Sequence, residues 1–249
     1  MSRVLTAQDH VPDGGPGRED GAGRDPVMRS AVHRAHAAMG GTFELRAGWD
    51  VPSLYGTERD EVAALESTLG FADVSARGKV HLSGAVDGFI QKLTGGAVEP
   101  LRTAPARSGG NHPAGLVARI ARDWALALVP ASTEPALIAE LDGSPTDAAM
   151  ATDVTSALSG FLVAGPRLED FLAQSVTLDV ADLRSGTCAA ATWSRIPAVL
   201  VVRELLAPAV EIYVGSDHGR YAWETIRRLG DRVGGSPVGW RALDTFGWT

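Results

Sequence analysis

Two histidines near the N-terminus are the first side chains whose spacing could do chemistry. His33 and His36 stand three residues apart in a segment that we expect to form a short helix. They would share one face of that helix and could begin a metal site. No acidic residue or third histidine lies nearby in the sequence to complete a ligand set. We therefore expect surface histidines and predict no metal site.

The single cysteine, Cys188, could act as a nucleophile only if its thiol were readily deprotonated. It lies in Gly-Thr-Cys-Ala at residues 186–189, before an expected strand, with no adjacent basic group to lower its pKa. We expect a small core residue. A lone cysteine also excludes a disulfide framework, and any cysteine-based zinc or iron–sulfur site, within this chain.

The motifs of several common chemistries are missing from the 249 residues. We find no Gly-x-Ser-x-Gly elbow, no phosphate loop and no dinucleotide-binding glycine pattern. The net charge of -7 disfavours nucleic-acid binding, which needs a basic face. No apolar run approaches the roughly 20 residues of a membrane helix, and the N-terminus has no secretory pattern. The expectation is a cytoplasmic protein with no nucleic-acid or membrane partner.

The elements that would position a site begin after a glycine-rich N-terminal segment. Residues 1–27 lack apolar periodicity and cannot bury enough surface to offset their backbone entropy, so we predict a disordered leader. Of the whole chain, 45% is hydrophobic, which is typical of a globular protein. We therefore predict one folded domain over residues 28–249.

An internal repeat at an offset of about 80 residues indicates how this domain is built. Asp-Val-Ser at residues 73–75 matches Asp-Val-Thr at residues 153–155. Each motif precedes an apolar strand that ends in a glycine, Gly84 or Gly165, and then a helix. A glycine at this corner suits a turn that a Cβ would obstruct. The alternative is that the offset is coincidental.

The second parts of the two halves also correspond. Residues 116–129 and residues 198–214 each predict a hairpin, and each hairpin leads into a helix, at residues 220–229 in the second half. The order strand–helix–strand–strand–helix is similar to a ferredoxin-like unit. The sequence therefore predicts an α+β fold. Its two pseudo-repeated ferredoxin-like halves, roughly 28–145 and 146–249, would form one domain.

One family is similar to this chain in several ordered segments. Ala-Gly-Trp-Asp-Val-Pro at residues 47–52, then Tyr55, then Gly-Phe-Ala-Asp-Val-Ser at residues 70–75 resemble the start of the glycine cleavage T-protein, a tetrahydrofolate-dependent aminomethyltransferase. Weaker matches follow at residues 162–166, 210–214 and 239–245. The resemblance spans roughly residues 30–247. It implies a T-protein-type folate-binding domain, with tetrahydrofolate as the cofactor.

The resemblance also implies binding residues. Glu211 matches the family glutamate that hydrogen-bonds the pterin edge, Val51 takes the place of a methionine near the pterin, and Tyr55 matches a family tyrosine. A carboxylate can accept two hydrogen bonds from an amine and a ring N–H. The alternative for Glu211 is an exposed strand residue that alternates with inward apolar neighbours.

Two departures from the family put its usual chemistry in doubt. Gly96 stands where the family has a catalytic aspartate, and Leu243 stands where it has an arginine. Glycine and leucine can neither relay a proton nor stabilise charge. Glu99, three residues after Gly96, is a candidate substitute carboxylate; the alternative is a solvated loop residue. Otherwise the catalytic residues are unknown.

Three functions remain open at this point. The first is a tetrahydrofolate-binding protein that handles an aminomethyl, methyl or methylene unit with an altered site, together with a small-molecule donor or acceptor. The second is a non-catalytic subunit of an amine oxidase or dehydrogenase complex. It is favoured by the lost side chains, by the lack of a counterpart to the family's C-terminal domain, and by a similarity to the γ subunit of heterotetrameric sarcosine oxidase. The third is a repurposed fold for another planar substrate.

Overall fold

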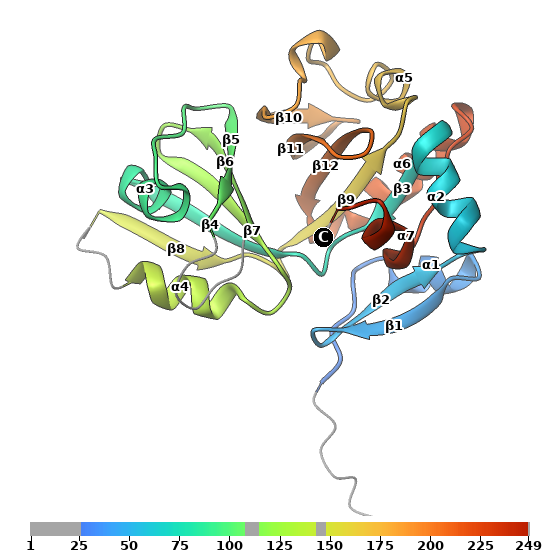
Figure 1. Cartoon of the computed structure of the whole chain (residues 1–249), viewed down its shortest axis with the longest axis horizontal. Coiled ribbons are helices and arrows are strands. Elements are labelled where there is room, and N and C mark those ends of the chain that lie inside the picture. The colour runs from blue at the N-terminus through green and yellow to red at the C-terminus, as the bar shows by residue number, and fades with distance from the viewer. Residues whose placement is uncertain (1–25, 108–114, 143–147, 249) are drawn as a thin grey trace, which may run out of the picture.

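The computed structural model describes residues 26–107, 115–142 and 148–248 of the chain (Figure 1). Most of the predicted leader, residues 1–27, therefore lies outside the described residues. Within the described ranges no helix is long and apolar enough to cross a lipid bilayer. Figure 1 shows two sheets side by side, with an N-terminal hairpin below them and the C-terminal end of the chain between these parts.

One antiparallel sheet holds five strands in the order β5 (Arg102–Ala106), β6 (Gly115–Ala121), β7 (Trp124–Val129), β4 (Gly78–Gly84) and β8 (Ala149–Asp153). Alternate residues of a strand point to the same face, so Val80 and Leu82 of β4 share one face. There the helices α3 (Asp87–Thr94) and α4 (Glu134–Asp142) bury them. This apolar cluster is the core of the first half.

The other sheet holds six strands in the order β10 (Cys188–Trp193), β11 (Ile196–Glu204), β12 (Pro208–Gly215), β9 (Leu158–Ala164), β3 (Gly70–Asp73) and β13 (Ser236–Pro237). Helices α5 (Leu168–Leu172) and α6 (Gly219–Arg232) cover one of its faces. Trp223 and Ile226 of α6 pack there against Phe161 and Ile212. Helix α6 occupies the segment where the sequence predicts a helix.

The two sheets exchange one strand each. Strand β3 precedes β4 in the chain but pairs with β9, and β8 precedes β9 but pairs with β4. Each exchanged strand ends in the repeated Asp-Val-Ser/Thr motif. In each motif the aspartate accepts a hydrogen bond from the backbone N–H two residues later, at 2.9 Å for Asp73 and 2.8 Å for Asp153. These local turns end the strands and direct the chain into the opposite sheet.

The hydroxyl group of each motif, on Ser75 or Thr155, bonds the backbone of the other copy of the repeat. Ser75 Oγ accepts a hydrogen bond from the Gly160 N–H at 3.1 Å, and Thr155 Oγ1 accepts one from the Lys79 N–H at 2.9 Å. Each hydroxyl thus satisfies a buried donor at the start of the strand that belongs to the other copy of the repeat. The repeat seen in the sequence is therefore a pair of equivalent crossings between the sheets.

The α+β class expected from the sequence is confirmed, and the structure contains elements that the sequence analysis did not predict. Each half has an additional strand between the helix that follows the repeated motif and the predicted hairpin. This strand is β5, after α3, in the first half and β10, after α5, in the second. Strand β5 contains Pro105 and β10 is rich in alanine, and both features are unfavourable strand signals. In addition, the strand exchange means that the sheets do not follow the expected division between residues 145 and 146.

Four of the remaining elements cover part of the free face of the six-stranded sheet, namely β1 (Thr42–Arg46), β2 (Trp49–Leu54), α2 (Glu58–Ser67) and α7 (Trp240–Thr245). Helix α1 (His33–Ala38) instead lies at the face that α6 covers, where Ala35 packs against the cluster that contains Trp223. On the free face, Leu65 of α2 and Leu243 of α7 pack against Leu162 of β9. The rest of that face, including Val201 and Tyr213, packs against the five-stranded sheet. The region covered by α2 and α7 and the region in contact with the five-stranded sheet lie on the same face of the six-stranded sheet. A pocket lies next to both regions.

Candidate functional site

A pocket of about 400 Å³ lies where the β1–β2 hairpin, both sheets and the C-terminal segment meet. We call it the central pocket. Its polar and aromatic lining consists of Arg46, Arg77, Arg203, Trp240 and Trp248. Its apolar lining includes residues 129–131 at the end of β7. Ligand sites commonly have volumes of about 300–1,000 Å³, so the pocket is large enough for a small molecule.

Glu211 lies beside this pocket with a fully buried side chain. Its Oε1 accepts hydrogen bonds from Arg77 Nη1 at 2.5 Å, Arg203 Nη1 at 2.8 Å and Trp248 Nε1 at 3.2 Å. Its Oε2 accepts bonds from Arg77 Nη1 at 2.6 Å and from the Tyr213 hydroxyl. Four protein side chains therefore occupy the acceptor positions of this carboxylate.

The charges around Glu211 keep it ionised. Burial alone would raise the pKa of Glu211, but the charges of Arg77 and Arg203 and the bond from Tyr213 lower it to about 2. Burial and the neighbouring carboxylate raise the pKa of Tyr213 well above its usual value, so Tyr213 stays a donor. At neutral pH the cluster holds two positive charges and one negative charge.

The local structure explains why these groups meet. Glu211 lies in the middle of β12, opposite Val201 of β11. Arg203 lies two residues further along β11, and Arg77 follows the first crossing motif. The Tyr213 ring packs against Gly160, where a Cβ would lie only 2.8 Å from the ring. A larger residue at 160 would displace the tyrosine that bonds Glu211.

Two tryptophans from the C-terminal segment form an aromatic wall. The Arg77 guanidinium lies 5.3 Å from the centre of the Trp248 ring, and that of Arg46 lies 5.4 Å from the Trp240 ring. The two indoles meet edge to face, with centroids 5.2 Å apart. The Trp240 Nε1 donates to the Asp73 carbonyl oxygen at 2.9 Å. Both rings are thereby fixed relative to the crossing strand.

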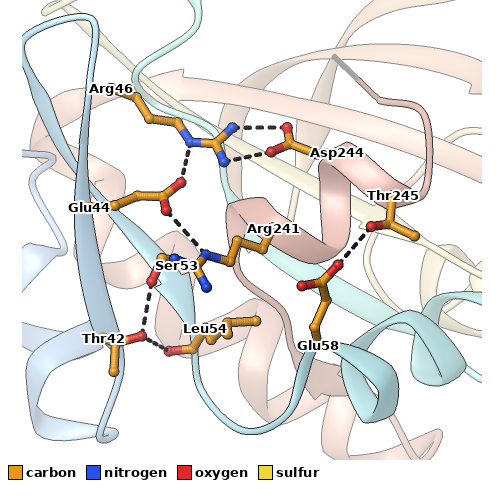
Figure 2. A network of polar contacts seen from close by, with 9 residues as sticks. All are labelled: Thr42, Glu44, Arg46, Ser53, Leu54, Glu58, Arg241, Asp244 and Thr245. Carbon is orange, nitrogen blue, oxygen red and sulfur yellow. Dashed lines mark hydrogen bonds and ion pairs between the residues drawn. The ribbon is translucent and has the colours of Figure 1, made fainter.

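Figure 2 shows how the hairpin is joined to α7 next to this wall. Arg46 donates through both Nη atoms to the Asp244 carboxylate, with Nη1 to Oδ1 at 2.9 Å, and through Nε to Glu44. The other oxygen of Glu44 accepts from Arg241 Nε at 3.3 Å. Two arginines are thus matched by two carboxylates. Arg46 adds no net charge to the pocket and instead holds the hairpin against Trp240.

The predicted site residues take different positions in the structure. Glu211 is buried beside the central pocket, so the alternative of an exposed strand residue is wrong. Val51 is buried behind the pocket, in the same apolar cluster as both tryptophans. Neither Val51 nor Tyr55 belongs to the pocket lining among the described residues. Glu99 is exposed in the loop before β5 and does not line the pocket either.

Tyr55 belongs to a separate buried cluster. Its hydroxyl hydrogen-bonds His36 Nδ1 at 2.7 Å, and His36 Nε2 hydrogen-bonds Asp73 Oδ2 at 2.9 Å. His36 has no exposed surface, so the expectation of two surface histidines is wrong for this residue. His33 is part-buried and hydrogen-bonds Asp50 at 2.9 Å. Each acidic partner is distant in sequence, and local spacing could not identify it.

Sequence reasoning missed the two arginines that bond Glu211. The signal that could have found them is Glu211 itself, because a carboxylate between the apolar residues Val210 and Ile212 needs a positive partner if it is buried. The sequence does not say which of many arginines supplies it. Cys188 is buried as expected, and burial raises its pKa to about 12, which is unsuited to a nucleophile.

Comparison with known proteins decides the family. A model of the GCVT N-terminal domain matches residues 32–247. The chain belongs to the GCVT N-terminal domain family. This confirms the T-protein resemblance drawn from the sequence.

Two curated proteins illustrate the similarity of this chain to known sequences. An aminomethyltransferase of Streptomyces coelicolor is 26% identical over 231 residues, which cover 88% of this chain and 62% of that protein. The sarcosine oxidase subunit alpha of Corynebacterium sp. strain P-1 is 27% identical over 253 residues, which cover 90% of this chain and 26% of that protein. The chain thus spans less than two thirds of the length of these relatives.

Two solved structures share the fold of this GCVT-family chain. Aminomethyltransferase T of the glycine cleavage system from Bartonella henselae superposes with a TM-score of 0.76 at 17% identity, covering 88% of this chain and 62% of that one. A chain of the heterotetrameric sarcosine oxidase of Corynebacterium sp. U-96 superposes with a TM-score of 0.61 at 14% identity, covering 85% of this chain and 98% of that one.

The two departures from the T-protein pattern can now be placed within the GCVT domain. Gly96 follows α3, and a Cβ there would meet no atom within 4 Å, so packing does not require a glycine. Leu243 is fully buried in α7, where it contributes to the core beneath the six-stranded sheet. Neither residue lines the central pocket of the described structure. Arg46, Arg77 and Arg203 are the cations of its lining.

Proposed function

We propose that this chain binds a tetrahydrofolate-type ligand in the central pocket and takes part in handling a one-carbon unit, whether aminomethyl, methyl or methylene. The observation that carries the proposal is the position of Glu211. The residue that the T-protein resemblance assigns to the pterin lies beside a pocket walled by two indole rings. Trp240 and Trp248 keep only 7% and 5% of their surface exposed, so they offer a planar ligand a narrow apolar contact.

The pocket fits a folate in some respects and not in others. Its volume and its aromatic and apolar walls suit a flat ring system, and its arginines suit carboxylates. Glu211 is already bonded by four protein side chains, so in this arrangement it holds the guanidinium groups and is not free to accept from a pterin. With glycine at residue 96, any rate gain would come from positioning rather than from proton transfer there.

Calorimetric titration with tetrahydrofolate tests the proposal. We expect saturable binding by the wild-type protein and weaker binding by Glu211→Gln, because a neutral amide cannot hold both guanidinium groups in place. Glu99→Gln is the matched control, since Glu99 is an exposed glutamate outside the pocket. No heat of binding from the wild type, or equal affinity in Glu211→Gln, would contradict the proposal.

The second candidate is a non-catalytic subunit of an amine oxidase or dehydrogenase complex. The internally neutralised Glu211 and the glycine at residue 96 support it. So does the similarity to a chain of heterotetrameric sarcosine oxidase, of which 98% is covered. Leu45 on β1 and Leu206 in the β11–β12 turn are 65% and 69% exposed and could take part in such an assembly.

Purification of the tagged protein from its native host separates the two candidates. A stable complex with an amine oxidase or dehydrogenase, identified by mass spectrometry and by its mass in solution, would support the subunit. A monomer that by itself turns over a folate substrate would exclude it. The cytoplasmic location expected from the sequence stays a prediction that the same fractionation can test.

A further inference from the structure

The polarity of the central pocket differs from that of a site built to bind an amine. In the described lining the charged residues are all arginines, and no carboxylate faces the pocket. The one nearby acid that bonds Arg77 and Arg203 is Glu211, which has no exposed surface. A ligand in this pocket therefore meets hydrogen-bond donors rather than acceptors at its charged end.

The positive charges of the three arginines that line the central pocket are not fully neutralised by their carboxylate partners. Arg46 is matched by Asp244 and by Glu44, which it shares with Arg241. Arg77 and Arg203 share the single charge of Glu211. One positive charge is left over beside a partly enclosed space with aromatic walls, where charge is less well screened than on an open surface.

The two guanidinium groups also have donors to spare. Both arginines donate to Glu211 through Nη1, whereas a guanidinium carries five N–H donors. Their side chains are 10% and 22% exposed, so part of each reaches the pocket. Glu211 on one side and the Trp248 ring under Arg77 restrict their motion. A fixed pair of guanidinium groups matches the geometry of a carboxylate.

We infer that the central pocket recognises its ligand by an anionic group, a carboxylate, bound by Arg77 and Arg203, with Glu211 as their buried counter-charge rather than a ligand contact. The flat apolar body of the ligand would lie against Trp240, Trp248 and the apolar end of β7. This inference rests on the proposed function for the place of the site, but it assigns recognition to the acidic part of a folate instead of to its pterin.

Two fragments of a folate test this directly. p-Aminobenzoylglutamate carries the carboxylates without the pterin, and 6-hydroxymethylpterin carries the pterin without a carboxylate. We expect p-aminobenzoylglutamate to bind and to compete with tetrahydrofolate, and the pterin to bind at least about tenfold more weakly than tetrahydrofolate. A hydrogen bond between charged groups is worth roughly a factor of ten or more in affinity.

Variants of Arg203 locate the contact. Arg203→Met should lower the affinity for p-aminobenzoylglutamate about tenfold or more. Arg203→Lys should lower it less, because lysine keeps the positive charge but cannot form the two parallel hydrogen bonds of a guanidinium group. Arg220→Met is the matched control, since Arg220 lies on the exposed side of α6 and pairs with Glu224. Thermal unfolding of each variant confirms that it is folded.

The outcomes separate this inference from the proposed function. If 6-hydroxymethylpterin binds as tightly as tetrahydrofolate, or if Arg203→Met binds p-aminobenzoylglutamate normally, the inference is overturned while folate binding stands. If p-aminobenzoylglutamate binds through Arg203 and tetrahydrofolate does not bind, carboxylate recognition stands and the proposed function fails. If no probe binds, both are overturned.

Discussion

Replacing Glu211 by glutamine should remove a defined part of the pH dependence of stability. The pKa of Glu211 is about 2 in the folded protein, against 4.5 for an ordinary glutamate. Each pH unit of difference corresponds to about 1.4 kcal/mol, so ionised Glu211 contributes about 3 kcal/mol to the free energy of unfolding. Because the folded pKa is the lower one, this stability is complete above about pH 4.5 and is lost as the pH falls towards 2.

Urea unfolding at several pH values measures the effect. At pH 7 we expect Glu211→Gln to unfold about 3 kcal/mol more easily than wild type, since Arg77 and Arg203 lose their counter-charge. The difference should shrink steadily at pH 4 and pH 3. Glu99→Gln, at an exposed position, should show no such trend. An equal difference between wild type and Glu211→Gln at pH 7 and pH 3 would refute the proposed charge cluster.

Two further substitutions test the framework around the site by thermal and urea unfolding. Tyr55→Phe should cost about 1–3 kcal/mol, because it leaves buried His36 without the bond at Nδ1, whereas Tyr221→Phe removes a bond on the surface and should cost less; equal losses would count against the buried cluster. Gly165→Ala should cost at least about 2 kcal/mol, because φ is +138° and a Cβ would lie 2.5 Å from a backbone oxygen. Gly186→Ala, with positive φ but open space, should cost only about 1 kcal/mol, and a larger loss there would mean that steric contact does not decide these sites.

The duplication could be predicted from sequence, but the exchange of strands could not. Asp73 and Asp153 sit at matching positions before similar strands, and this pattern is enough to predict two equivalent halves. Which strand pairs with which depends on where the turn sends the chain. The partners that decide this, Gly160 for Ser75 and Lys79 for Thr155, are far away in sequence.

The site could be predicted only as far as its central carboxylate. Glu211 stood out because of the family resemblance and its place in an apolar strand. Its environment depends on Arg77 and Trp248, which are brought to it by the crossing strand and by the C-terminal segment. Contacts between segments more than 30 residues apart leave no local pattern. This is why the sequence analysis named the glutamate and missed Arg77, which is 134 residues away. Arg203 is only eight residues from Glu211, but nothing in the local pattern distinguishes it from the other arginines.

We propose that the arginines of the central pocket bind the ligand. A crystal structure of the protein grown with tetrahydrofolate would show whether they do. We expect the ligand between the Trp240–Trp248 wall and the end of β7, with a carboxylate within hydrogen-bonding distance of Arg203 and with Glu211 still bonded to Arg77. A ligand bound elsewhere, or a pterin bonded to Glu211 after the arginines have moved away, would contradict this proposal.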